Sequence, residues 1–178
     1  AACATRVPSG AIRSSVSREA ARRLGYELLD TGAAYRALTW MALEEGLDLT
    51  DASAIVALLD HFPYRTEPEH VWVGATDVTA AIREPRISAE VSAIARVPEV
   101  RVALNEAFRR LMSATSAPGM VVEGRDITTV VAPDAPVRIL LTADKSVFAV
   151  ADGALYKLAD KDAPLTGLTA NQIWAKAR

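Results

Sequence analysis

The N-terminal third of the sequence alternates between short apolar runs and helical patterns, and this alternation limits the fold more than any other feature. Residues 1–5 and 26–29 are candidate strands, the first of them short and rich in small side chains. Residues 14–24 and 33–45 have apolar side chains at helical spacing. Strands and helices in alternation are typical of an α/β protein with a parallel central sheet.

Helix boundaries in this region have recognisable sequence signals. Gly25 and Gly46 follow the two helical patterns, at the position where a helix often ends in a left-handed residue. Either Thr50 or Asp51 is expected to cap a third helix over residues 54–59, because both side chains accept hydrogen bonds from free backbone N–H groups.

The middle of the chain departs from this alternation. Residues 62–97 are predicted to form a small insert, with short antiparallel strands at 64–66 and 71–73 and a helix near 88–95. A long helix over residues 99–112 is expected to begin after Pro98, which is tolerated in the first helical turn.

The alternation returns in the second half. Residues 120–123 are a predicted core strand, and Gly124, Arg125 and Asp126 follow it directly. The run at residues 137–141, apolar apart from Arg138, is typical of a strand inside a parallel sheet. Thr142 is expected to cap a helix over residues 144–151, and residues 171–177 have weak helical periodicity.

Composition excludes several classes of protein. A length of 178 residues fits one domain, and a net charge of −2 argues against a general nucleic-acid binder, which needs a basic face. The single cysteine, Cys3, excludes internal disulfides and a cysteine-based zinc site. No apolar run approaches the length of a membrane span, and no signal peptide is recognisable. These features predict a soluble cytoplasmic protein, with His61 and His70 as surface residues.

Basic and carboxylate side chains follow several of the predicted strands. In an open parallel sheet, ligands bind at the carboxyl ends of the strands. The candidates at this edge are Asp30, Thr31, Arg36, Arg125 and Asp126. Arg36 lies about one helical turn after Thr31, so the two side chains could clamp a phosphate. Each residue taken alone is better explained as a helix cap or as part of a surface ion pair, and only their joint placement at one edge favours an anion site.

A loop at residues 7–15 has the outline of a phosphate-binding loop, G-x-x-x-x-G-K-[ST]. Val7 and Ile12 stand where the pattern has glycine, and Arg13 stands where it has lysine, while Ser14 agrees with it. A β-branched residue is poorly tolerated at a positive φ angle. The guanidinium of Arg13 keeps the positive charge but differs in shape from a lysine ammonium group.

Five segments give the chain a specific resemblance to bacterial cytidylate kinases, which are P-loop nucleoside monophosphate kinases. The matching segments are S-S-V-S-R-E-A-A-R-R-L-G-Y at residues 14–26, L-D-T-G-A-A-Y-R at 29–36, D-V-T-A-A-I-R at 77–83, V-S-A-I-A-R-V-P-E-V-R at 91–101 and V-V-E-G-R-D-I-T-T-V-V-A-P-D-A-P-V at 121–137. The resemblance implies a three-layer α/β P-loop kinase fold with a parallel central sheet. It also implies that residues 62–97 are a monophosphate-binding insert within a single domain.

The resemblance further implies transfer of the ATP γ-phosphoryl group to CMP or dCMP, and a role for individual residues. Residues that match the family's acceptor-phosphate ligands are Thr31, Arg36 and Arg125, and those that match its cytosine-reading residues are Ser92, Arg101 and Asp126. The donor loop is Ser9, Gly10, Ala11, Ile12, Arg13, Ser14 and Ser15, with Arg13 and Arg125 as catalytic candidates and Ser14 as the Mg²⁺ ligand. Two arginine guanidinium groups can together bind a dianionic phosphate. The edge of cytosine has an amino donor beside ring acceptors, so it is matched by a protein acceptor beside a protein donor.

Simpler interpretations remain open for some of these residues. Ser92 could be a surface serine of a helix, and Arg101 could pair with Glu99 or Glu106. Trp40 and Met41 are expected in the core, and Trp72 is expected to pack within the insert.

The chain departs from the family in its donor loop and at its C-terminal end. Leu141 leads into a segment without arginine until Arg178, so the lid arginines of the family have no counterpart, and the chain is short for the family's remaining segment. Loss of such arginines lowers phosphoryl-transfer rates by on the order of 10³-fold. The alternative is therefore a catalytically weak or silent nucleotide-binding or protein-interaction module. Expected partners of the kinase are small-molecule nucleotides, and it is expected to act as a monomer.

Overall fold

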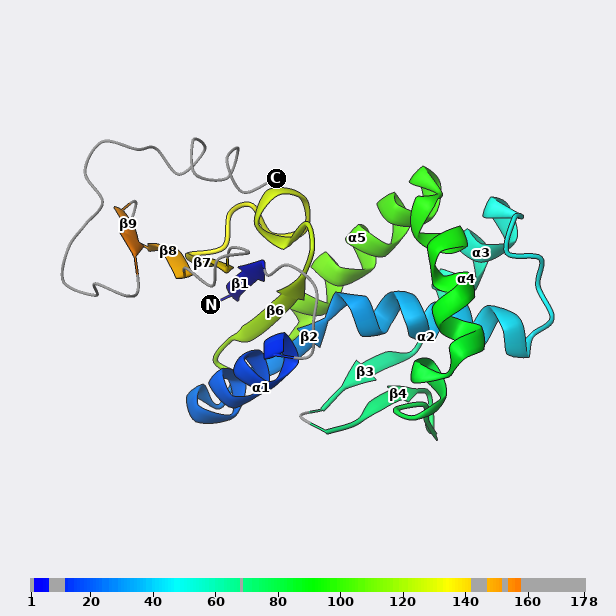
Figure 1. Cartoon of the computed structure of the whole chain (residues 1–178), viewed down its shortest axis with the longest axis horizontal. Helices are drawn as coiled ribbons and strands as arrows, with labels where there is room; N and C mark the ends of the chain where they lie inside the picture. The colour runs from blue at the N-terminus through cyan, green and yellow to red at the C-terminus, as the bar shows by residue number, and fades with distance from the viewer. Residues whose placement is uncertain (1, 7–11, 68, 142–146, 152–153, 158–178) are drawn as a thin grey trace. The chain divides into compact units, whose positions relative to one another are not determined.

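A computed structural model describes residues 2–6, 12–67, 69–141, 147–151 and 154–157 (Figure 1). Side chains are described for residues 17–67, 69–139 and 149–150. The chain divides into two compact units. The sheet unit contains residues 1–27 and 116–178, and the helical unit contains residues 28–115.

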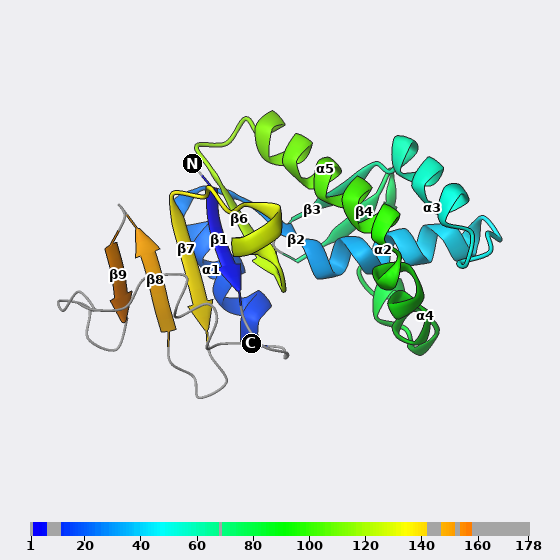
Figure 2. The ribbon, with the colours of Figure 1, turned by 90° about the horizontal axis from the view of Figure 1, so that it is seen from above.

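Six strands form one sheet in the order β2-β6-β1-β7-β8-β9. Their bounds are β1 Ala2–Arg6, β2 Glu27–Asp30, β6 Met120–Gly124, β7 Val137–Leu141, β8 Val147–Ala151 and β9 Ala154–Lys157. Strand β1 is parallel to both β6 and β7, with Cys3 opposite Val121 on one side and Val137 on the other. Figure 2 shows β7 and β1 side by side in this arrangement. The parallel sheet predicted from the alternation of elements is confirmed.

Burial explains why β6 is a central strand. Its residues Val121 and Val122 are 1% and 0% exposed, as expected for a strand of a parallel sheet that is covered on both faces. Helix α1 (Ile12–Leu24) packs on β6 in the sheet unit and buries Ser17 and Ala21. Gly25 ends this helix with a φ angle of 64°, the left-handed conformation predicted for that position.

The prediction of a helix over residues 144–151 is wrong. Residues 147–151 form strand β8, which is antiparallel to β7, and β9 extends the sheet by a further antiparallel strand. The run Val147-Phe148-Ala149-Val150 is apolar throughout, so its period does not distinguish a helix from a buried strand. Pairing with the neighbouring strand β7 decides the outcome. Thr142 and the weakly helical residues 171–177 lie outside the described residues.

Four α-helices make up most of the helical unit. They are α2 Thr31–Glu44, α3 Ala52–Leu58, α4 Pro85–Arg96 and α5 Pro98–Ala114, with short 3₁₀ turns η1 at Leu59–His61 and η2 at Ala81–Arg83. Their core includes Leu38, Ile94 and Leu104, all 0% exposed. The carboxylate of Asp51, rather than Thr50, caps α3 by accepting a hydrogen bond from the backbone N–H of Ala54 at 3.0 Å.

Trp40 and Met41 do not belong to this core, contrary to expectation, because both are only partly buried. The inward face of α2 carries the smaller side chains of Ala34, Ala37 and Ala42 instead. Small residues on this face let neighbouring elements approach the helix closely, and α2 contacts α4, η2 and β4.

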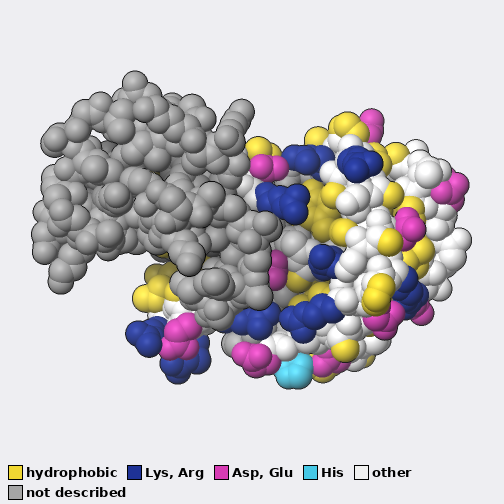
Figure 3. All heavy atoms as spheres, in the orientation of Figure 1, with side chains coloured by type: hydrophobic (Ala, Val, Ile, Leu, Met, Phe, Trp, Pro, Cys, Tyr) yellow, Lys and Arg dark blue, Asp and Glu magenta, His cyan; other side chains and the backbone are white. Residues whose placement is uncertain are grey.

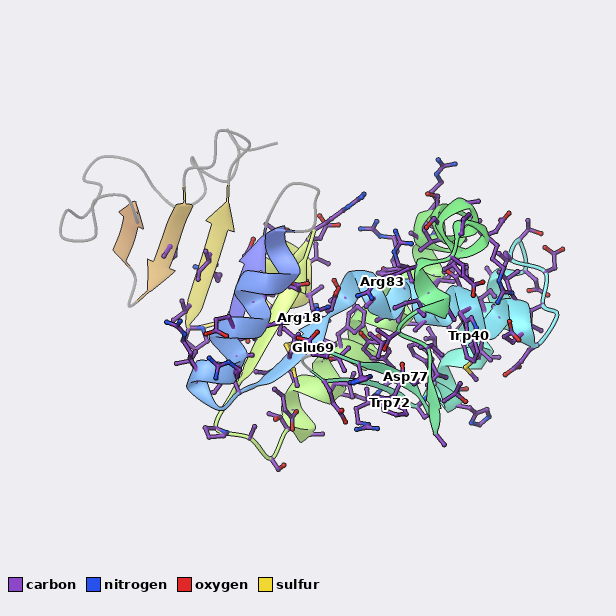
Figure 4. All side chains as sticks on the ribbon, turned by 60° about the horizontal axis from the view of Figure 1, so that its bottom comes forward. Arg18, Trp40, Glu69, Trp72, Asp77 and Arg83 are labelled. Atoms are coloured by element: carbon purple, nitrogen blue, oxygen red, sulfur yellow. The ribbon has the colours of Figure 1, made fainter. Side chains whose placement is uncertain are left out.

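A small antiparallel sheet also belongs to the helical unit, and the strands predicted at residues 64–66 and 71–73 are confirmed. Its strands are β3 Tyr64–Thr66, β4 Val71–Val73 and β5 Thr76–Asp77. Val71 and Val73 are buried, whereas Trp72 points to the other face (Figure 4). The assignment of residues 62–97 as a functional insert stays a prediction.

Among the residues that the structure describes, none of the helices combines the length and the apolar character needed to cross a membrane.

Candidate functional site

The turn between β2 and α2 holds the first predicted site residues. Asp30 is the N-cap of α2, and its carboxylate accepts a hydrogen bond from the backbone N–H of Ala33 at 2.9 Å. A Cβ atom on Gly32 would lie 3.3 Å from Oδ1 of Asp30, which is tighter than most real Cβ contacts. Thr31 begins the helix and is 6% exposed. The Asp-Thr-Gly sequence thus forms a cap in which glycine leaves room for the capping carboxylate.

Strand β3 is tied to this turn by two side chains. The phenol of Tyr64 donates a hydrogen bond to the backbone carbonyl of Asp30 at 2.8 Å, and the hydroxyl of Thr66 donates one to the carbonyl of Leu28. Tyr64 is buried, and its ring stacks on Phe62 with 5.5 Å between centroids. These contacts hold the small sheet against the end of β2, within a few residues of Thr31.

Arg36 reaches from α2 to two elements that lie far along the sequence. Its Nη1 atom donates a hydrogen bond to Oγ of Ser88 on α4 at 2.9 Å and makes a longer contact with the carbonyl oxygen of Ile82 at 3.4 Å. Both acceptors are uncharged. Among the described residues Arg36 forms no ion pair, so its positive charge is not balanced by a neighbouring carboxylate.

Arg86 provides the contrasting case in the same helical unit. Its Nη2 atom lies 2.9 Å from Glu44 Oε1, and its Nε atom lies 2.7 Å from Glu84 Oε2. These two carboxylates raise the pKa of Arg86 above its usual value. A guanidinium with two carboxylate partners fits a structural role, whereas one with neutral partners is suited to bind an anion.

Charge on the surface does not by itself identify the anion site. All lysines of the chain lie beyond residue 141, so every basic side chain of the helical unit is an arginine. Figure 3 shows basic and acidic side chains interspersed on this unit. Arg36 and Arg86 differ in the charge of their hydrogen-bond partners, and the density of positive charge on the surface does not distinguish them.

Ser92 and Arg101 lie on the two helices that follow. Ser92 is exposed on α4, four residues after Ser88, and residues at this spacing share one face of a helix. Arg101 is exposed near the start of α5, which packs against α4. The helical unit therefore carries four of the predicted acceptor residues, Thr31, Arg36, Ser92 and Arg101, and the contact between Arg36 and Ser88 joins α2 to the helix that bears Ser92.

Arg125 and Asp126 belong to the sheet unit and follow the carboxyl end of β6. Arg125 is exposed and Asp126 is partly buried. The backbone carbonyl of Asp126 accepts hydrogen bonds from the N–H groups of Val130 at 2.9 Å and Val131 at 3.3 Å, which opens the π-helical turn η3 (Ile127–Val131). π-helical turns are rare in proteins, and those that do occur are often found at functional sites. Nothing in the sequence pattern predicted this turn.

The predicted donor loop falls between β1 and α1. Ser9, Gly10 and Ala11 lie outside the described residues, as does Val7. The backbone of Ile12, Arg13, Ser14 and Ser15 forms the first turn of α1, and their side chains lie outside the described set. The described backbone on either side of residues 7–11 is the parallel strand β1 and the N-terminus of helix α1, and helix N-termini bind phosphate groups in many nucleotide-binding proteins.

Two residues near the predicted site have no role that the sequence predicts. Ser88 lies 52 residues from Arg36 along the chain, and no local pattern connects them. Arg83 closes η2, lies beside α2 in Figure 4, is exposed and forms no ion pair among the described residues. Its position in the D-V-T-A-A-I-R segment was the only sequence feature that drew attention to it.

The histidines are exposed, as predicted, but one of them has a carboxylate partner that was not expected. Nδ1 of His70 lies 2.7 Å from Oδ2 of Asp77. No group of three or more metal-ligating side chains occurs within the part of the chain that the structure describes.

A sheet in which β6, β1 and β7 run parallel, with helix α1 packed on β6, defines an α/β protein. More specifically, the chain belongs to the cytidylate kinase family: the family model described as cytidylate kinase matches residues 4–151.

Similar proteins come from several bacteria. A cytidylate kinase of Streptomyces avermitilis is 45% identical over 158 residues, which cover 86% of this chain and 68% of that protein. One from Rhodococcus opacus is 49% identical over 140 residues, 76% of this chain and 60% of that protein. A bifunctional pantoate ligase/cytidylate kinase of Synechococcus is 45% identical over 141 residues, which cover 76% of this chain and 28% of that protein. The chain thus matches only part of the length of each of these relatives.

Proposed function

We propose that this protein is a cytidylate kinase that transfers the γ-phosphoryl group of ATP to CMP or dCMP and releases ADP with CDP or dCDP. The observation that carries the proposal is Arg36, a partly buried guanidinium whose acceptors, Ser88 Oγ and the Ile82 carbonyl, are both neutral. Membership of the cytidylate kinase family supports the same reaction.

The acceptor side of the proposed site divides into two sets of residues. Thr31, Arg36 and Arg125 are proposed to bind the phosphate of the acceptor nucleotide. Ser92, Arg101 and Asp126 are proposed to bind the cytosine. The base offers an amino donor beside ring acceptors, so a carboxylate and a guanidinium together complement it.

On the donor side, the loop before α1 is proposed to bind the ATP phosphates, with Arg13 supplying a positive charge. Ser14 lies in the first turn of α1, a position compatible with a ligand of Mg²⁺. Mg²⁺, when bound with ATP, would neutralise part of the negative charge on the donor phosphates.

The transfer requires little covalent help from the protein. An oxygen of the acceptor phosphate forms a bond to the γ-phosphorus, and the bond between that phosphorus and the β,γ-bridging oxygen breaks, so ADP leaves with the bonding electron pair. Two anionic groups must approach each other for this step. The proposed contribution of Arg36, Arg125 and Arg13 is to align the phosphates and to stabilise their charge.

A second candidate function has its own support in the sequence. Val7 and Ile12 stand where the family's loop has glycine. A side chain there hinders backbone N–H groups from closing around a triphosphate, and forcing a non-glycine residue to be left-handed costs about 1–2 kcal/mol. The second candidate is a protein that binds CMP but does not turn it over.

The proposed phosphate role of Arg36 is tested by two arginine variants of the helical unit. We expect Arg36→Ala to weaken CMP binding at least about tenfold, because a hydrogen bond to a charged group contributes about 1.5–3 kcal/mol and about 1.4 kcal/mol corresponds to a tenfold change. ATP binding should change little. Isothermal titration calorimetry with CMP and with ATP measures both dissociation constants. Arg86→Ala is the matched control, since it removes an arginine that already has carboxylate partners.

The same titrations, combined with a coupled assay of ADP release, separate the candidate functions. CMP binding with CMP-dependent ADP release supports the kinase. CMP binding without ATP binding or turnover would leave the silent nucleotide-binding protein. Equal losses of CMP and ATP binding in Arg36→Ala would contradict the acceptor-site role of this residue.

The proposed kinase acts as a monomer in the cytoplasm, with nucleotides as its partners. Sedimentation velocity with and without CMP and ATP tests the oligomeric state, and a dimeric species at micromolar concentration would contradict it.

A further inference from the structure

Arg36 is oriented by groups that the family resemblance does not assign. A guanidinium has five N–H donors, and two of them belong to Nη1. Ser88 Oγ lies 2.9 Å from Nη1, and the Ile82 carbonyl oxygen lies 3.4 Å from it. Both acceptors therefore engage the same nitrogen. Within the described part of the chain, these are the hydrogen bonds of the Arg36 side chain, so the Nε and Nη2 side of the guanidinium, which can bind two phosphate oxygens at once, is left for an anion.

We propose that Ser88 is a positioning residue for the acceptor phosphate: its hydroxyl holds Nη1 of Arg36 and so presents the Nε and Nη2 edge to the phosphate. This inference rests on the proposed function, because it assumes that Arg36 binds the phosphate of CMP. Ser88 itself is not proposed to touch the nucleotide.

The backbone of Ser88 is fixed within helix α4, while its side chain is exposed. The backbone N–H of Ser88 donates to the carbonyl of Glu84 at 3.1 Å, within the first turn of the helix. Helix α4 packs against α2, which carries Arg36, and against η2, which carries Ile82. A long arginine side chain loses rotamer freedom when it binds a ligand. Restraint by Ser88 before binding lowers that loss, so more of the contact energy appears as affinity.

The absence of charge on the two acceptors of Arg36 matters as much as their positions. A carboxylate at the place of Ser88 would hold Nη1 equally well, but it would also offset the positive charge. Arg86 shows this outcome in the same helix, since Glu44 and Glu84 bind its guanidinium. A hydroxyl and a carbonyl fix the direction of Arg36 and leave its full charge for the phosphate.

The experiment measures dissociation constants for CMP and for cytidine, which lacks the phosphate, by calorimetry. We expect Ser88→Ala to raise the dissociation constant for CMP about five- to tenfold, because the unrestrained Arg36 side chain then loses its rotamer freedom on binding. The constant for cytidine should not change. Ser88→Thr keeps the hydroxyl and should stay within about twofold of the unaltered protein. Ser113→Ala is the matched control, because Ser113 is an exposed helix serine on α5.

A double-mutant cycle gives a second, independent readout. If Ser88 acts only through Arg36, then Ser88→Ala should weaken CMP binding no further in the Arg36→Ala background. Loss of folding does not explain a weaker affinity, since alanine has a higher helix propensity than serine. The unfolding midpoint of Ser88→Ala should therefore equal or exceed that of the unaltered protein.

The possible results bear on the proposed function and on the role of Ser88 separately. Absence of CMP binding by the unaltered protein would overturn the proposed function and this inference together. A loss in Arg36→Ala without a loss in Ser88→Ala would overturn only the role of Ser88. Equal losses for CMP and cytidine in Ser88→Ala, or additive losses in the cycle, would assign Ser88 a general structural role and also overturn the inference.

Discussion

At the scale of single residues, hydrogen-bond partners distinguish functional from structural side chains of one type. Arg36 and Arg86 belong to the same compact unit and both contact α4 or lie on it. One has neutral acceptors and the other has two carboxylates. The sequence presents both simply as arginines, and only their surroundings show which of them keeps an uncompensated charge.

Helix caps allow a comparison of the same kind. The Asp30 carboxylate caps α2 with a 2.9 Å hydrogen bond to the Ala33 N–H, and Asp51 caps α3 with a 3.0 Å bond to the Ala54 N–H. We expect Asp30→Ala and Asp51→Ala each to lower the free energy of unfolding by about 1 kcal/mol, because each leaves a backbone N–H without its cap. Urea denaturation measures both losses.

CMP binding should separate these two variants. Asp30 adjoins Thr31 and begins the helix that carries Arg36, so Asp30→Ala should also weaken CMP binding, whereas Asp51→Ala should not. Similar dissociation constants for the two variants would show that the cap at Asp30 has no influence on the site.

At the scale of elements, the small sheet of the helical unit has two different faces. Tyr64 and Thr66 bond to the end of β2, whereas Arg65 lies over the ring of Trp72, 5.1 Å from its centroid. Trp72 pairs across the sheet with Arg65 on one side and with Asp77 on the other. One face thus anchors the sheet to the turn that precedes α2, and the outer face carries a row of charged and aromatic side chains.

The carboxyl group of Asp77 makes the stability of this sheet depend on pH. The Thr79 hydroxyl, the Thr79 backbone N–H and His70 all bind the carboxylate, and they lower the pKa of Asp77 from its usual 3.8 to about 2. A pKa that is lower in the folded state contributes stability above the unfolded pKa, and this contribution is lost as the pH falls through the folded value. The relevant window therefore lies between pH 3.8 and about 2.

Asp77→Asn tests this dependence. Free energies of unfolding, measured by denaturant titration from pH 6 down to pH 2, should differ between the variant and the unaltered protein above about pH 4. The difference should shrink as the pH approaches 2, because the native carboxyl group then becomes protonated. Other carboxylates titrate in both proteins and cancel. A difference that stays constant over this range would contradict the shifted pKa.

At the scale of the whole molecule, the chain crosses between its two units twice, after Glu27 and after Thr115. The proposed acceptor residues are distributed accordingly, with Arg36 and Ser92 in the helical unit and Arg125 and Asp126 in the sheet unit. Neither unit alone contains every residue that the cytidylate kinase resemblance implies.

Binding of CMP should stabilise the native chain by mass action. At a CMP concentration of 100 times the dissociation constant, the gain is about 2.7 kcal/mol. For a protein of this size that gain corresponds to a rise in the unfolding midpoint of roughly 5–10 °C. Differential scanning calorimetry measures the shift. Arg36→Ala should lose at least about half of it at the same CMP concentration, since its affinity is expected to be at least about tenfold weaker. An unchanged midpoint at high CMP in the unaltered protein would contradict nucleotide binding.

Local sequence patterns predicted the features that depend on neighbouring residues. The glycine at 25, the cap of α3 at Thr50 or Asp51 and the apolar run of β6 were all recognisable because their physical causes act within a few residues, and the structure then decided for Asp51. The run at residues 147–151 failed as a helix prediction because its partner, β7, decides its conformation. The roles assigned to Arg13, Ser14, Arg125 and Asp126 remain predictions.

By itself, the sequence determined the parallel α/β arrangement, the approximate positions of most helices and the resemblance that assigns the chain to a family of kinases. Only the tertiary structure decided which groups surround each functional side chain. Arg36 and Ser88 are 52 residues apart, and packing of α4 against α2 brings them within 2.9 Å. Periodicity and capping act over one or two helical turns, whereas the orientation of a charged side chain depends on whichever distant groups the folded chain places beside it.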